Sequence, residues 1–140
     1  MIFALTVLCW ILYSSLFGYC DAWYWYSANV GKYSIKDFKF KDLHPHYFVM
    51  RSIVGSLFSL LIFQNNFFEW LGGVICLGMV FPFFHNGFYY LTRNKIDPTK
   101  YPKGFYDMSS TSISKINFTF IARLILAILG LLGIGLIYFL

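Results

Sequence analysis

Charge is scarce in this sequence, and negative charge most of all. Of its 140 residues, 12% are Asp, Glu, Lys or Arg and only six are acidic, whereas 59% are hydrophobic. A typical soluble domain has about 25% charged residues. A chain this short has no interior large enough to bury so much apolar surface in water. The composition therefore excludes an ordinary soluble domain and indicates an integral membrane protein.

Several chemical motifs are also missing. Cys9, Cys20 and Cys76 lie in apolar runs without a CxxC pair, so we expect buried thiols that pack as small hydrophobes. There is no HExxH zinc motif and no GxSxG nucleophile elbow, and we expect no cofactor. The apolar run Ile2 to Tyr19 lacks a basic segment before it and an A-x-A cleavage site, which favours a transmembrane helix over a signal peptide.

What the sequence does have is long apolar stretches. A helix needs about 20 apolar residues to cross a bilayer, and the sequence contains several stretches near or above that length. A short polar turn, Gln64-Asn65-Asn66, predicts an antiparallel hairpin of the second and third stretches. We therefore predict an all-α fold, a single transmembrane domain over residues 1–140 built as a four-helix bundle. The predicted spans are residues 2–26, 46–63, 67–93 and 116–140.

The basic residues indicate the orientation of these spans. They gather in the loops 29–45 and 94–115 and next to them, whereas the hairpin turn and both chain ends carry no Lys or Arg. By the positive-inside rule both loops are cytoplasmic and both termini are non-cytoplasmic. We expect an integral protein of a bacterial inner membrane. Because the loops account for the net charge of +5, we expect no nucleic-acid partner.

This topology places an ionisable side chain from each span at a similar depth. Asp21 lies at the inner end of the first span, and Arg51, His85 and Arg123 lie inside the other three. At a rise of about 1.5 Å per residue, Arg123 sits roughly 10 Å inside its span. Charges at this depth are costly unless they are paired or hydrated, so we expect the four groups to face one another. Two arginines against one aspartate favour an anion as the ligand.

The candidate site residues follow from this layer. His85 and Asp21 are the candidate catalytic residues. Each candidate also has a purely structural interpretation: arginines that extend to lipid phosphates, an aspartate that only forms an ion pair, and a histidine that packs as a neutral group. The candidate ligand-binding residues are Arg51, His85, Asn86, Tyr89, Arg93 and Arg123.

A metal site at His44 and His46 is the weaker alternative. The two histidines flank Pro45 at the start of the second span, and a metal would need further ligands from His85 and an aspartate. Since the sequence has no metal-ligand motif that supplies them, we expect no metal.

Three functions remain open. The favoured hypothesis is a non-enzymatic membrane protein, oligomeric or bound to a partner membrane protein, whose inner-leaflet site binds an anionic lipid headgroup or an anionic solute. The second is an oligomeric channel or transporter, although no span carries a continuous polar stripe. The third is an intramembrane enzyme acting on a lipid-linked phosphate. In that case two arginines hold the phosphate, His85 acts as acid or base, and Asp21 orients it.

Overall fold

The protein is a bundle of four helices. The computed structural model describes residues 2–29, 44–64, 66–107, 109–110 and 117–139. The predicted all-α membrane fold is confirmed. The elements are α1 (Ile2–Asn29), α2 (His44–Ile62), α3 (Phe67–Ile96), the 3-10 turn η1 (Gly104–Tyr106), the two-residue strands β1 (Ser109–Ser110) and β2 (Asn117–Phe118), and α4 (Phe120–Phe139).

Three of the helices in the described part of the chain are long and apolar enough to cross a bilayer. These are α1 over Ile2–Ser27, all of α3, and α4, and each contains an apolar window of at least 18 residues. The fourth helix, α2, has a shorter apolar stretch, Tyr47–Ile62. The chain is therefore a small integral membrane protein. The identity of the membrane and the side on which the termini lie remain predictions.

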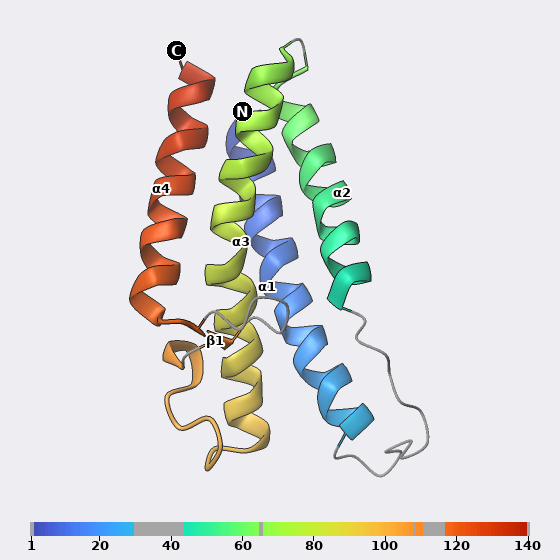
Figure 1. Ribbon diagram of the computed structural model, residues 1–140, viewed down its shortest axis with the longest axis vertical. Coiled ribbons are helices and arrows are strands. Elements are labelled where there is room, and N and C mark those ends of the chain that lie inside the picture. The colour runs from blue at the N-terminus through green and yellow to red at the C-terminus, as the bar shows by residue number, and fades with distance from the viewer. Residues whose placement is uncertain (1, 30–43, 65, 108, 111–116, 140) are drawn as a thin grey trace.

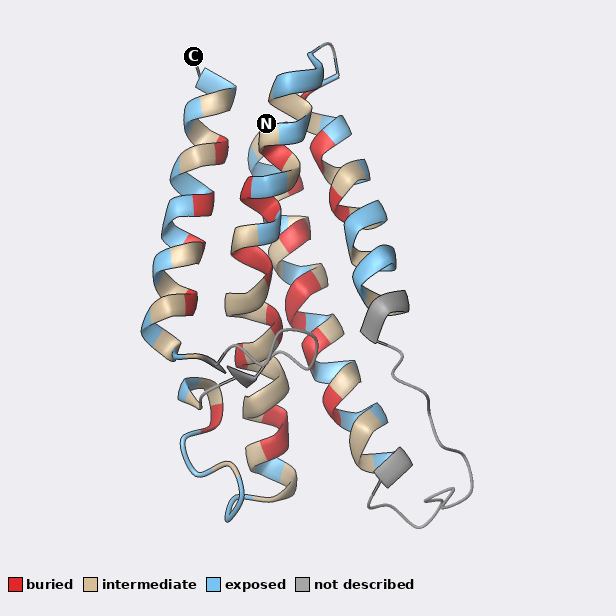
Figure 2. Cartoon of the chain, viewed as in Figure 1, coloured by how far each residue is buried: buried red, intermediate tan, exposed pale blue. Residues whose placement is uncertain are grey.

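Helix α3 is the hub of the bundle. It lies between α4 on one side and α1 and α2 on the other (Figure 1). In Figure 2 the buried residues lie mainly along the helix surfaces that face the inside of the bundle, and the outward surfaces are exposed. The apolar core comprises Trp10, Phe63, Cys76, Leu77, Val80, Phe81 and Ile134.

The hairpin between α2 and α3 is fixed by polar contacts at its turn. Asn66 caps α3, because its side-chain oxygen accepts a hydrogen bond from the Phe68 amide at 3.0 Å. The Ser59 hydroxyl donates to the Trp70 carbonyl at 2.7 Å, and the Trp70 indole donates to the Ser56 carbonyl at 3.2 Å. The two helices are therefore held together at this end, as an antiparallel hairpin.

The helix boundaries differ by a few residues from those expected: α1 ends at Asn29 rather than at residue 26, and α2 covers His44–Ile62 rather than residues 46–63. α3 continues through Pro82 and ends at Ile96, three residues beyond the expected boundary at residue 93. α4 begins at Phe120, later than the expected residue 116, because Asn117–Phe118 pair with β1 as a short antiparallel ladder. The Thr119 hydroxyl then accepts a hydrogen bond from the Ala122 amide at 3.2 Å, which satisfies a free donor in the first turn of α4.

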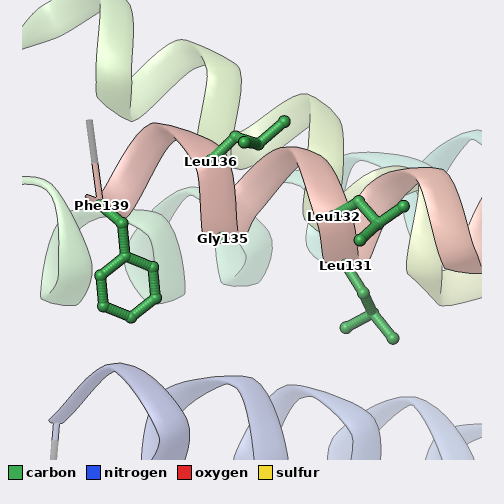
Figure 3. A pocket seen from close by; sticks show the side chains of 5 residues that line it. All are labelled: Leu131, Leu132, Gly135, Leu136 and Phe139. Atoms are coloured by element: carbon green, nitrogen blue, oxygen red, sulfur yellow. The ribbon is translucent and has the colours of Figure 1, made fainter.

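The C-terminal half of α4 carries a shallow apolar groove. Its lining side chains lie on the helix surface in Figure 3, and none of them is polar. A bilayer covers a surface of this kind with acyl chains, so the groove itself requires no protein partner. The lining residues are Leu131, Leu132, Gly135, Leu136 and Phe139.

Candidate functional site

Asp21, Arg51 and His85 meet inside the bundle, one from each of α1, α2 and α3. Nη2 of Arg51 lies 2.8 Å from Oδ2 of Asp21, and Nε2 of His85 lies 3.0 Å from the same oxygen. Nη2 of Arg51 is also 3.2 Å from Nε2 of His85. These three side chains are named the triad below. Its Asp21–Arg51 ion pair balances one negative and one positive charge.

Close helix packing makes this meeting possible. Gly18 of α1 is buried, and a Cβ at this position would clash with the carbonyl oxygen of His85. Small residues allow such backbone approaches in membrane helices. Because Asp21 is three residues after Gly18, it lies about one helical turn away. The glycine contact therefore brings Asp21 within reach of His85.

Aromatic rings surround the triad. The guanidinium of Arg51 lies 4.8 Å from the centroid of the Phe17 ring and 5.0 Å from that of Phe81. The His85 ring stacks on Phe81 at 4.8 Å, and only 7% of His85 is exposed. Arg51 and Asp21 retain 25% and 21% side-chain exposure. His85 is therefore largely shielded from solvent, whereas the Asp21–Arg51 ion pair is partly exposed.

Arg123 lies on the other face of α3. It is fully buried, and its Nη2 donates to the carbonyl oxygens of Phe105 at 3.0 Å and Asp107 at 2.7 Å. The Phe105 ring fills the space beside Gly87, where a Cβ would clash with it. Arg123 therefore secures the segment after α3 to the bundle. Its Nε and Nη1 groups have no acceptor in the described part of the chain.

Arg93 lies beyond the triad, near the end of α3. Its guanidinium packs 4.0 Å from the Trp25 ring centroid and 4.9 Å from that of Tyr101. Nζ of Lys100 lies 5.6 Å and 5.8 Å from the same two rings. Arg93 is 2% exposed, and its Nε and Nη1 lack an acceptor among the described residues. Arg93, Lys100, Trp25 and Tyr101 form what is called the Arg93 cluster below.

The segment after α3 holds this cluster in place. The Asp97 amide donates to the Arg93 carbonyl at 2.8 Å, and the Asn94 side chain donates to the Tyr101 carbonyl at 2.7 Å. The carboxylate of Asp97 accepts a hydrogen bond from the Thr99 hydroxyl at 2.7 Å. This bond lowers the pKa of Asp97 from its usual value, because it stabilises the charged form. Asp97, the acidic residue nearest to Arg93 along the chain in this segment, is therefore hydrogen-bonded to its neighbour Thr99.

The predicted layer is divided by α3. Asp21, Arg51 and His85 come together as expected, with Asn86 Oδ1 2.9 Å from His85 Nδ1 and the Tyr89 ring 6.5 Å from the His85 ring. Arg123 does not join them. Phe83 and Gly87 of α3 face Phe105 and the α4 side, whereas Phe81 and His85 face α1.

The aromatic partners of Arg93 were not anticipated from the sequence. Trp25 belongs to an aromatic run suited to the membrane interface, and Tyr101 belongs to a loop. Neither the spacing nor the residue type shows that the two rings enclose one arginine. The side chains of His44 and His46 lie outside the described part. Within that part, no group of three or more potential metal ligands occurs.

Comparison with known proteins adds no relative. No protein-family model, no curated protein and no solved structure matches the chain. The chemistry of the two polar sites is therefore what indicates a function for this protein.

Proposed function

We propose that the protein binds the phosphate of an anionic lipid headgroup at the Arg93 cluster. The observation that carries this proposal is the state of Arg93: a nearly fully buried guanidinium with two N–H groups that lack an acceptor in the described chain. Its described contacts in the cluster are with aromatic rings. Ring faces attract a cation, but they supply neither a counter-charge nor a hydrogen-bond acceptor in the guanidinium plane.

Oxygen partners in the described part of the chain distinguish the other two arginines from Arg93. Arg51 has Asp21 at 2.8 Å, and Arg123 has two backbone carbonyls as acceptors. An unpaired buried cation costs several kcal/mol. A phosphate supplies both the missing charge and the missing oxygens, and charge-assisted bonds to guanidinium are among the strongest hydrogen bonds in proteins.

The position of the cluster also fits a lipid headgroup. It lies at the end of α3 where the exposed cations Lys95, Lys100 and Lys103 gather, whereas the turn at the other end carries Glu69 and no Lys or Arg. Trp and Tyr side chains favour the membrane–water interface. Basic groups beside a span attract anionic lipids by about 1 kcal/mol each. Lys100 shares both rings with Arg93 and is exposed, so it offers the first contact to an approaching phosphate.

Lipid selectivity of an Arg93→Gln variant tests the proposal. Native mass spectrometry of the protein in mixed phosphatidylglycerol and phosphatidylcholine micelles should show preferential phosphatidylglycerol adducts. Loss of a charge-assisted bond worth about 1.5–3 kcal/mol corresponds to a loss of roughly tenfold or more in affinity. Arg93→Gln should therefore abolish most of the preference.

Lys95→Gln is the matched control. It removes one positive charge from the same end of α3, but Lys95 is exposed and lies outside the cluster. The preference should fall by no more than about fivefold, which corresponds to the roughly 1 kcal/mol that one basic group beside a span contributes. Equal losses in the two variants would show non-specific attraction and would overturn the proposal. Inorganic phosphate in a second arm should compete if a free anion is the ligand, and should not compete if the lipid is required.

A further inference from the structure

The second polar site, the triad, presents an unusual arrangement of donors and acceptors around one histidine. Both ring nitrogens of His85 face oxygen atoms: Nε2 faces Oδ2 of Asp21 at 3.0 Å, and Nδ1 faces Oδ1 of Asn86 at 2.9 Å. Nε2 also lies 3.2 Å from Nη2 of Arg51, which is a donor. One nitrogen therefore has a donor and an acceptor within hydrogen-bond distance at the same time.

A single protonation state of His85 cannot use both of these neighbours. When Nε2 has no proton, it accepts from Arg51, and Nδ1–H donates to Asn86. The carboxylate oxygen of Asp21 then meets a nitrogen lone pair at 3.0 Å. When Nε2 carries a proton, it donates to Asp21, and the contact with Arg51 becomes donor against donor. With both nitrogens protonated, each N–H has its own oxygen acceptor.

We propose that the triad is a proton-binding site within the membrane-spanning part of the bundle. A proton from water adds to Nε2 of His85, so the formal charge of the triad rises from 0 to +1. The hydrogen bond from Arg51 to His85 is exchanged for one from His85 to Asp21. Arg51 then shares its carboxylate partner with a second cation. This inference does not rest on lipid binding at the Arg93 cluster, which uses other residues.

The charged and titratable groups described around His85 come from α1, α2 and α3. Asp21 is the acidic group at His85 from α1, and Arg51 is the cation from α2, with the Tyr47 ring 5.7 Å from its guanidinium. From α3 itself, Tyr89 stacks at 6.5 Å. Tyr13 of α1 lies within electrostatic range of the Asp21–Arg51 pair. Arg123 is on the far side of α3.

Protonation of His85 also affects how firmly α2 is attached to the rest of the bundle. At its other end α2 is tied to α3 through Ser59 and Trp70. At the triad end, Arg51 provides the described ion pair between α2 and the rest of the bundle. Weakening the hold of Asp21 on Arg51 therefore loosens α2 at this end alone. The partial exposure of both side chains gives water and protons access to the pair.

Nitrogen NMR of the imidazole tests the proposal. The chain has three histidines, so His44→Gln with His46→Gln leaves His85 as the sole imidazole. In ¹⁵N-histidine-labelled protein in bilayers, we expect one protonated and one unprotonated ring nitrogen at about pH 8, and two protonated nitrogens at about pH 5, the interval in which histidine typically changes charge. An unprotonated Nε2 that persists at the lower pH would overturn the proposal.

Two variants separate proton binding from a simple packing role. Asp21→Asn in the same background removes the carboxylate that holds the imidazolium, so the doubly protonated fraction at about pH 5 should fall several-fold. Arg51→Gln removes the donor to Nε2, so the neutral ring at about pH 8 should move toward the Nε2–H form that donates to Asp21. Unchanged nitrogen signals in both variants, with the rest of the spectrum intact, would contradict the assignment.

Discussion

Replacement of Gly18 by alanine is expected to separate α1 from α3 and to dismantle the triad. A Cβ at this position meets the carbonyl oxygen of His85, which is backbone and cannot rotate away. Overpacking of a well-packed interior typically costs about 1–3 kcal/mol, and a rigid backbone contact lies at the upper end of that range. The variant should unfold at a clearly lower SDS mole fraction than the parent protein.

The loss should extend to the triad because Asp21 lies about one turn beyond the substituted position. If α1 moves outward by even about 1 Å, the 3.0 Å contact between Nε2 of His85 and Oδ2 of Asp21 lengthens beyond hydrogen-bond distance. Gly78→Ala is the matched control, since no atom lies within 4 Å of a Cβ built there. Alanine is the better helix former by about 0.5–1 kcal/mol, so this variant should be as stable as the parent. Equal destabilisation of the two variants would contradict the proposed close contact.

Replacement of Trp10 by alanine is the second substitution with a large expected effect. Trp10 is 2% exposed, and its indole donates to the Leu77 carbonyl at 2.9 Å. Its ring also packs against Phe58 at 5.5 Å and Phe81 at 5.8 Å, so it joins three helices. In water-soluble cores a change of this kind costs about 3–5 kcal/mol. In a bilayer lipid replaces water as the solvent for apolar groups, so we expect the lower end of that range.

Trp23→Ala provides the comparison for Trp10→Ala. Trp23 is on the same helix, but 44% of it is exposed. Its removal leaves no internal cavity, and the cost should stay below about 1 kcal/mol. SDS titration followed by circular dichroism should rank the two variants in this order. A Trp10 variant as stable as the Trp23 variant would show that the three helices are not joined through this ring.

The main architecture could be predicted because it depends on composition and length. Apolar runs of about 20 residues give spanning helices whatever their detailed sequence, and the polar turn before α3 indicated the hairpin. The positions of Asp21, Arg51 and His85 along their helices could also be predicted, since the rise per residue of a helix is constant. These three groups lie together in the structure, as depth and the cost of buried charge suggested.

The direction in which each side chain points was harder to predict. Arg123 was expected to face His85, but α3 lies between them. One face of α3 packs against α1, and the opposite face packs against α4. The sequence does not show that α3 is the hub, because α1 and α3 are similarly apolar and α4 is more apolar than either. The role of Arg93 depends on two rings brought from α1 and from the segment after α3. Such contacts between distant segments have no local pattern.

The proposal that Arg93, which has no counter-charge among the described residues, recruits an anionic headgroup at the end of α3 is tested most directly by photo-crosslinking. The protein would be placed in bilayers containing a phosphatidylglycerol analogue with a diazirine in its headgroup, and the labelled peptides would be identified by mass spectrometry. The proposal predicts that adducts concentrate at Trp25 and at residues 93–101, and that Arg93→Gln removes them. Adducts that gather near Glu69, or that spread evenly over the outer surfaces of α2 and α4, would contradict it.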